Sequence, residues 1–241
     1  MSIYDILPIG TRLEGNTYPG RGIVIGKSED GKKAVIAYFI MGRSQNSRNR
    51  VFVVHDGDLF TEPYDESKVE DPSLIIYAAV RSYDKYMVVT NGDQTDTVVK
   101  GLRQGQTFTQ ALRCRAFEPD APNFTPRISG MLTFDRGDFT YEMSILKSID
   151  EKGSACARYT FAYPSQAGLG HFIHTYVCDG NPIPTFQGEP ERIRLRGSID
   201  DMTQEIWSAL DKNNRISLFV RTRDLETGET MDRLINANGE K

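Results

Sequence analysis

The residues best suited to chemistry begin with a short arginine-rich loop. In the stretch 42–50, which reads GRSQNSRNR, arginines alternate with small hydroxyl and amide side chains. A guanidinium group presents a planar fork of donors that matches phosphate oxygens, and the hydroxyl and amide groups add neutral donors. A solvated, charged surface turn explains the same composition equally well. If the loop binds a single phosphate, its candidate contacts are Arg43, Arg48 and Arg50 with the interleaved Ser44, Asn46, Ser47 and Asn49.

A second candidate group lies on a predicted strand pair. Tyr77, Arg81 and Tyr83 are separated by even numbers of residues, so on a regular strand they share one face. A phenol beside a guanidinium could donate or accept a proton, because the positive charge stabilises the phenolate form. A tyrosine that packs in a sheet with its hydroxyl in water is the commoner case.

The densest polar run separates a predicted strand from a predicted helix. Residues 91–96 read NGDQTD, and residues 123–127, which read NFTPR, follow the helical region. Loops of this composition between regular elements commonly carry binding groups. Helix capping explains some of these side chains, but not the whole run together with Thr-Pro-Arg. The run 91–96 and the segment 123–127 are therefore candidate ligand-binding segments.

Glu118 lies after the predicted helix 107–117 and beside two prolines, in the segment FEPDAP. A carboxylate next to prolines has a restricted backbone, which suits a positioned general acid or base. Taken alone, Glu118 is better explained as a surface glutamate at a helix end.

The sequence does not favour a metal site. His171 and His174 are three residues apart, and on a strand such side chains point to opposite faces. The cysteines Cys114, Cys156 and Cys178 have no close spacing, which is typical of neither a disulfide framework nor a zinc site. We therefore expect no metal and no other cofactor.

Composition narrows the class of partner. The 241 residues are 39% hydrophobic, which allows a sizeable core, and the formal net charge is −4. This charge argues against general nucleic-acid binding, which needs a basic field over one face. No apolar run approaches the ~20 residues of a membrane span, and the N-terminus lacks the features of a signal peptide. We expect a cytoplasmic protein with a small-molecule partner, without nucleic acid or membrane.

The order of predicted elements favours an α+β fold with one domain. Strands are expected at 21–27, 33–40, 51–54, 74–81, 85–90, 128–134, 139–147, 155–163, 172–177, 215–223 and 230–235. Helices are expected at 97–103, 107–117 and, most clearly, 199–210, where Ser198 provides an N-cap. Because strands are grouped and helices come in separate blocks, antiparallel sheets are predicted. The stretch 61–72 is expected to be a surface excursion, residues 1–17 an N-terminal arm, and residues 18–241 a single domain.

Together, these segments resemble the archaeal-type IMP cyclohydrolase family and its bacterial relatives. The resemblance covers roughly residues 18–178 and depends on the order and spacing of short stretches. These are YPGRG at 18–22, GRS at 42–44 with Ser47, Asn49 and Arg50, YAAVR at 77–81, NGDQTD at 91–96, TPRI at 125–128 and HTY at 174–176. The C-terminal residues after this region show only a compatible strand–helix–strand pattern.

The resemblance implies a four-layer αββα sandwich of antiparallel sheets, similar to N-terminal-nucleophile hydrolases but without their self-processed nucleophile. The sequence agrees with the last point, because Tyr18–Arg21 contains no Ser, Thr or Cys. The implied partner is a small purine ribonucleotide, and a homo-oligomer is compatible with the resemblance.

The implied reaction closes the purine ring of 5-formamidoimidazole-4-carboxamide ribonucleotide and gives IMP and water. In this interpretation Glu118 is the base or proton shuttle, Tyr77 is the oxyanion donor and acid, and Arg50 or Arg43 supplies the charge beside Tyr77. The implied substrate contacts are Arg21, Arg43, Ser44, Asn49, Arg81, Asn91, Asp96, Thr125 and Arg127.

Two other functions remain open from the sequence. A purine-nucleotide-binding regulatory protein would bind IMP tightly without turnover. An amide hydrolase on the same fold would use Ser or Thr as nucleophile, with a covalent intermediate and a processed N-terminus.

Overall fold

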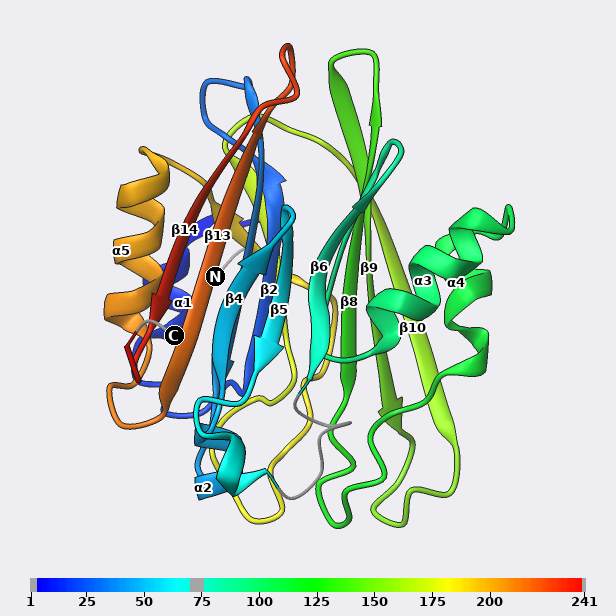
Figure 1. Cartoon of the computed structure of the whole chain (residues 1–241), viewed down its shortest axis with the longest axis vertical. Helices are drawn as coiled ribbons and strands as arrows, with labels where there is room; N and C mark the ends of the chain where they lie inside the picture. Colours follow the sequence, from blue (N-terminus) through cyan, green and yellow to red (C-terminus); the bar gives the residue numbers. More distant parts are fainter. Residues whose placement is uncertain (1–3, 70–75, 240–241) are drawn as a thin grey trace.

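The computed structural model describes residues 4–69 and 76–239, and within them the chain forms two seven-stranded sheets (Figure 1). The first sheet contains, in spatial order, β1 (Leu7–Pro8), β12 (Glu191–Arg194), β11 (Leu169–His174), β2 (Arg21–Lys27), β3 (Lys33–Met41), β13 (Arg215–Asp224) and β14 (Thr230–Asn236). The second contains β10 (Cys156–Pro164), β9 (Asp138–Ser148), β8 (Arg127–Asp135), β7 (Tyr86–Thr90), β6 (Tyr77–Tyr83), β5 (Asp58–Glu62) and β4 (Val51–His55). The short β1–β12 pair is parallel and the other pairs are antiparallel, which confirms the predicted α+β class.

The two sheets face each other and carry helices on their outer faces (Figure 1). Helices α1 (Ile9–Leu13) and α5 (Ile199–Ala209) cover the first sheet, and α3 (Gln94–Arg103) and α4 (Phe108–Ala111) cover the second. A short helix, α2 (Gln45–Arg48), follows β3, and 3₁₀ turns occupy Glu66–Lys68 and Leu112–Cys114. The arrangement is a four-layer sandwich.

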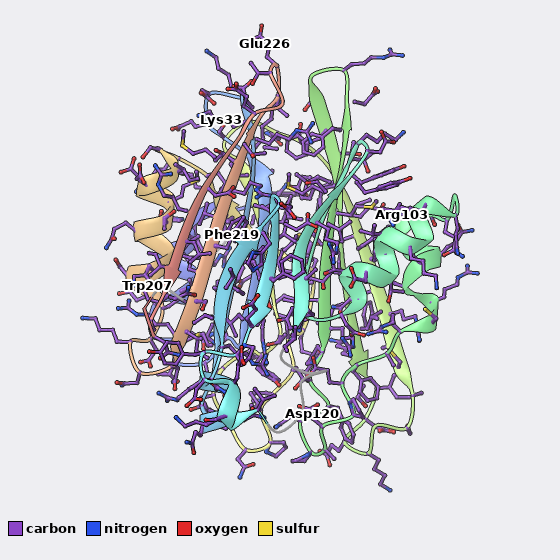
Figure 2. All side chains as sticks on the ribbon, in the orientation of Figure 1. Lys33, Arg103, Asp120, Trp207, Phe219 and Glu226 are labelled. Atoms are coloured by element: carbon purple, nitrogen blue, oxygen red, sulfur yellow. The ribbon has the colours of Figure 1, made fainter. Side chains whose placement is uncertain are left out.

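Alternating side chains of the central strands explain the layers. On β2, Ile23 and Ile25 point into the core between the sheets, whereas Val24 packs under α5. Strands buried on both faces lack a polar alternation, which is why β2 and β3 have nearly continuous apolar sequences. Phe219 of β13, labelled in Figure 2, belongs to the same inter-sheet core.

Helix α5 confirms the clearest helix prediction. Ser198 and Asp201 form a reciprocal capping box at its start, and Ile199, Met202 and Ile206 are buried against the first sheet. A capping box satisfies backbone N–H groups that have no partner within the helix. None of the helices among the described residues is long and apolar enough to cross a membrane.

Several boundaries differ from the sequence prediction. The short strands β1, β5 and β12 were not predicted, and the helix expected over 107–117 is α4 followed by a 3₁₀ turn that ends at Cys114. Residues 70–75 lie outside the described residues. The end of the predicted excursion at 61–72 and the start of the predicted strand at 74–81 fall in this range. The described part of residues 1–17 forms β1 and α1, whose Ile9 and Leu13 are buried beside α5.

Candidate active site

A pocket opens at one end of the sandwich, where β2 begins and β3 ends. Asp120 marks this end in Figure 2, at the same end of the molecule as α2 in Figure 1. The cavity volume is about 270 Å³. Its lining residues are Tyr18, Arg21, Arg43, Ser44, Asn46, Ser47, Arg50, Glu118, Asp120, Asn123, Thr125, Tyr176 and Ile183.

Two buried arginines form the inner wall of the pocket. Arg21 is the first residue of β2 and is 8% exposed, and Arg50 precedes β4 and is 6% exposed. Among the described residues, the Nε atoms of both side chains are buried without a hydrogen-bond partner. A buried polar group without a partner carries a desolvation cost, which an anionic or carbonyl-bearing ligand would offset. The wall is therefore suited to bind acceptor oxygens.

The two arginines affect each other's charge. Burial, followed by the neighbouring positive charge of Arg21, lowers the pKa of Arg50. Burial also acts to lower the pKa of Arg21, but the nearby phenols and the Glu118 carboxylate outweigh it, so that the pKa of Arg21 is raised. Arg21 stays charged, and its approach to the pocket depends on Gly20, which has φ of 79° and a position where any Cβ would collide with Thr175.

A tyrosine pair from the two sheets lies beside these arginines. The hydroxyl of Tyr77 on β6 is 2.9 Å from that of Tyr38 on β3, and either can be the donor. Burial, assisted by Tyr77, raises the pKa of Tyr38 well above its ordinary value. Both arginines interact electrostatically with Tyr77. A phenol beside a guanidinium is thus present, but the guanidinium groups come from Arg21 and Arg50.

Arg81 lies on the opposite face of β6 from Tyr77, so the predicted shared face was wrong. A bulge interrupts the β5–β6 register: Leu59 pairs with Val80 but Phe60 pairs with Ala78. The extra residue reverses which face each later side chain occupies. Arg81 consequently donates to Asp58 and to Asp96 of α3, each at 2.6 Å, and Tyr83 packs beside α3.

Glu118 lies in the loop before β8 and is half-buried in the pocket wall. Its backbone N–H donates to the carbonyl of Thr125 at 2.9 Å, which fixes its position. Burial is the largest influence and raises the pKa of Glu118; Arg21 and Arg127 oppose this rise, and Asp120 supports it. A carboxylate with a raised pKa is a suitable proton acceptor near neutral pH.

A hydrogen-bonded chain runs from the same loop to Tyr176, which lies two residues after β11. The Asp120 carboxylate accepts from the backbone N–H of Thr125 at 2.6 Å and from its hydroxyl. The Thr125 Oγ1 atom is in turn 2.7 Å from the hydroxyl of Tyr176. The ring of Tyr176 stacks on that of Tyr18, with centroids 5.8 Å apart.

The arginine-rich loop forms the outer side of the pocket. Ser44 caps α2 in a reciprocal box with Ser47, which explains why this loop contains a helix. Arg43 forms an ion pair with Asp179, donates to the carbonyl of Gly180 at 2.9 Å, and lies over the Tyr18 ring at 4.9 Å. The loop 179–180 and the arginine-rich loop are therefore joined at Arg43, which lines the pocket.

Other predicted site residues make their contacts within the protein. Asn49 exchanges hydrogen bonds with the backbone of Asp65 at 2.7 and 2.8 Å. Asn91 is buried; its amide donates to the Pro126 carbonyl, and its oxygen accepts from the Ile128 N–H and from Gln94, each at 2.9 Å. Arg127 donates to Asp93 and Gln94, yet its charge still influences Glu118.

The predicted divergence of His171 and His174 is confirmed. His171 Nδ1 is 2.6 Å from the Tyr141 hydroxyl between the sheets, whereas His174 stacks on Phe172 on the opposite face of β11. Among the residues that the structure describes, no group of three His, Cys, Asp or Glu side chains is placed to hold a metal ion.

Sequence reasoning did not select Tyr18, Tyr38, Asp120 or Tyr176 as site residues. Tyr38 lies within a continuous apolar strand, where no polar alternation marks it. Asp120 is a proline-flanked loop carboxylate like Glu118, so the local composition that singled out Glu118 could also have identified Asp120.

The fold and pocket define a class: an α+β sandwich with an arginine-rich binding pocket at one end of the facing sheets. Comparison with protein families identifies the family to which the chain belongs. The chain belongs to the family of IMP cyclohydrolase-like proteins, whose model matches residues 18–229.

Three of the curated relatives, all from archaea, illustrate the similarity. A protein named IMP cyclohydrolase from Methanopyrus kandleri is 35% identical over 116 residues, which cover 46% of this chain and 57% of the relative. A protein of the same name from Methanocaldococcus jannaschii is 29% identical over 116 residues, or 48% of this chain and 56% of the relative. A third protein of this name, from Natronomonas pharaonis, is 29% identical over 164 residues, which cover 64% of this chain and 78% of the relative. The chain thus spans little more than half the length of the first two relatives.

Proposed function

We propose that this protein is an IMP cyclohydrolase, which converts 5-formamidoimidazole-4-carboxamide ribonucleotide to IMP and water. The observation that carries the proposal is the convergence of Glu118, Arg21 and Arg50 at one pocket, where the Nε atoms of both arginines have no hydrogen-bond partner. Tyr77 interacts electrostatically with both arginines. Membership of the IMP cyclohydrolase-like family and the names of the archaeal relatives support the same assignment.

The reaction joins two groups of one molecule. The carboxamide nitrogen attacks the formyl carbon of the same substrate, so the protein need not supply a covalent nucleophile. Holding the reactive rotamer can contribute several kcal/mol to lowering the barrier. The pocket loop that carries Glu118, Asp120 and Thr125 is fixed by its internal hydrogen bonds and is suited to this positioning role.

Ring closure requires a base and an acid. An amide nitrogen is a weak nucleophile, so Glu118 accepts a proton from the carboxamide nitrogen as the C–N bond forms. The formyl oxygen gains negative charge as the bond forms, and Tyr77 donates a proton to it. The nearby positive charges of Arg21 and Arg50 stabilise this negative charge. The product of this step is a cyclic carbinolamine.

Dehydration restores both catalytic groups. The C–O bond breaks, and the oxygen leaves as water after it receives the proton held by Glu118. The nitrogen that carried the formyl group loses its proton to the Tyr77 phenolate as the C=N bond forms. The Tyr38 hydroxyl, 2.9 Å from that of Tyr77, can donate to the phenolate between the two steps.

The outer side of the pocket suits the phosphate of the substrate. Arg43 is a charged donor at this side. The hydroxyls of Ser44 and Ser47 donate within the capping box and must turn away from it to donate to phosphate. Because Arg43 is paired with Asp179, phosphate must replace or share that carboxylate. The imidazole and its two reacting groups then face Glu118 and Tyr77.

The same proposal includes the broader organisation of the protein. We place the sandwich with N-terminal-nucleophile hydrolases, used without a processed nucleophile, and assign residues 1–17 as an arm before a single domain at 18–241. The proposed site of action is the cytoplasm, and light scattering of the purified chain would determine whether it forms a homo-oligomer.

The direct test is turnover of the formamido ribonucleotide, followed by the rise of purine ultraviolet absorbance. We expect IMP to form at a rate proportional to protein concentration, and expect little formation by Glu118→Gln prepared in parallel. Tight binding of IMP without turnover by the wild type would instead indicate a regulatory protein. A mass increase on incubation with substrate would indicate a covalent intermediate and favour an amide hydrolase.

A further inference from the structure

We propose that Tyr176 presents a fixed hydrogen-bond acceptor to the bound nucleotide and thereby selects ribonucleotides over deoxyribonucleotides. The proposal rests on the proposed function for the presence of a nucleotide in the pocket. Its own basis is the direction of the hydrogen bonds in the chain Asp120–Thr125–Tyr176.

The direction of this chain is determined by its carboxylate end. An ionised carboxylate can only accept hydrogen bonds, so the Thr125 hydroxyl donates its single proton to Asp120. The Thr125 oxygen can then only accept from the neighbouring Tyr176 hydroxyl, 2.7 Å away. The Tyr176 proton is therefore directed at Thr125. The acceptor capacity of its oxygen is the only hydrogen-bonding function that the Tyr176 hydroxyl offers to the pocket.

Packing keeps Tyr176 in this orientation. The side chain is 2% exposed, and its ring stacks on Tyr18 with an interplanar angle of 19°. His174 Nδ1 also lies 2.7 Å from the Tyr176 carbonyl, to which it donates. A buried aromatic side chain held on its ring, backbone and hydroxyl loses little conformational freedom when a ligand binds.

The position of Tyr176 corresponds to the middle of a nucleotide. At the outer side of the pocket, Arg43 lies over the Tyr18 ring, and Tyr18 stacks on Tyr176. On the inner side, Tyr176 is close enough to Arg21 for an electrostatic interaction. With the phosphate near Arg43 and the base near Glu118, the group beside Tyr176 is the ribose.

A ribose hydroxyl is the donor that complements this acceptor. It can donate to Tyr176, whereas the C–H group of a deoxyribose cannot. A site whose buried polar group would be left unpaired discriminates against the ligand that lacks the matching group. We expect one of the two ribose hydroxyls to account for the selectivity.

The test compares dissociation constants for IMP, 2′-deoxy-IMP and 3′-deoxy-IMP, measured by calorimetry. Wild type should bind IMP roughly 3- to 10-fold more tightly than one of the deoxy forms, as the loss of one net hydrogen bond predicts. In Tyr176→Phe, which retains the ring, this ratio should fall to about one. An unchanged ratio in folded Tyr176→Phe would overturn the proposal.

A matched pair of variants tests the direction of the chain. Thr125→Val removes the hydroxyl and frees the Tyr176 proton to turn, so the ribose-to-deoxyribose ratio should shrink. Thr125→Ser retains the hydroxyl and should keep the ratio, and the exposed Tyr159→Phe on β10 serves as a remote control. Equal ratios in the Val and Ser variants would contradict the assigned direction, and this pair decides the outcome if Tyr176→Phe does not fold.

The two proposals fail in different ways. If wild type binds IMP and both deoxy forms equally, the role of Tyr176 is wrong while the proposed function stands. If wild type binds no purine ribonucleotide, both are wrong.

Discussion

The hydroxyls of Tyr38 and Tyr77 lie 2.9 Å apart although the two residues come from different sheets. Tyr38 belongs to β3 of the first sheet and Tyr77 to β6 of the second, so the pair exists only when the two sheets are packed together. The tyrosine pair lies near Arg21 and Arg50, so two phenols and two guanidinium groups meet at one place. This relationship is the basis of the first prediction.

Glu118→Gln and Tyr77→Phe should each lower kcat by roughly 10²–10⁴ and leave IMP affinity nearly intact. The first variant retains size but cannot accept the proton, and the second retains the ring but cannot donate one. The double variant should lose less than the product of the two factors, because a half-assembled relay has little further to lose. Steady-state kinetics with a melting-temperature check on each variant tests this, and wild-type turnover by folded Glu118→Gln would move the search for the base elsewhere.

Arg43→Ala should weaken binding of IMP by roughly 1.5–3 kcal/mol and of inosine far less, because the lost contact to phosphate is charge-assisted. Asp179→Asn should act in the opposite direction and tighten IMP binding by up to about 1 kcal/mol. In this variant the partly exposed Asp179 carboxylate no longer competes with phosphate for Arg43. Calorimetry with both ligands measures the effects, and the exposed Arg48→Ala controls for charge in the same loop. Equal losses for IMP and inosine would exclude phosphate binding by Arg43.

The pH dependence of kcat/KM should report Glu118. The base must be ionised, so activity falls as pH drops through its pKa, which burial raises above the ordinary value of about 4.3. Arg127→Ala removes a charge that opposes this rise and should move the acid limb to higher pH. Asp120→Asn removes a charge that supports it and should move the limb lower. Shifts in the same direction would indicate that another group controls the limb.

Acid should destabilise the fold through two buried histidines. Burial lowers the pKa of His171 and of His174 to about 4, against 6.5 for an unburied side chain. The unfolded chain therefore binds more protons between pH 6.5 and 4, so stability is complete above this window and decreases as pH falls through it. The loss is on the order of 3 kcal/mol per histidine across the window.

Urea unfolding at several pH values measures the slope of the free energy of unfolding against pH. His171→Gln should reduce the slope by about one proton. An unaltered slope in His171→Gln would mean that His171 does not titrate on unfolding.

Asn91→Ala should mainly reduce stability. The buried amide of Asn91 joins the start of α3 to the 126–128 backbone, and its loss leaves buried partners unsatisfied at a cost of about 1–3 kcal/mol. Chemical denaturation should show this loss, with exposed Asn213→Ala as control, while the folded variant keeps its affinity for IMP. A large loss of affinity at unchanged stability would restore Asn91 as a ligand contact.

The sequence by itself determined the properties that depend on local pattern. The capping box of Ser198 and the apolar stripe identify α5, and grouped strands predict antiparallel sheets. The anion site that the composition of the 42–50 loop suggests stays a prediction. Side-chain type and spacing control these features directly, because hydrogen bonds and apolar burial within one element repeat with its period.

Only the tertiary structure decided which groups meet in the pocket. Period two placed Tyr77 and Arg81 on one face, but the bulge at Ala79 reversed the later positions and turned Arg81 toward α3. Arg21 and Arg50 took its place beside Tyr77, and Tyr38 joined from the other sheet. A strand pattern specifies alternation within one strand, whereas a register shift and the contact between sheets depend on neighbouring strands that are distant in sequence.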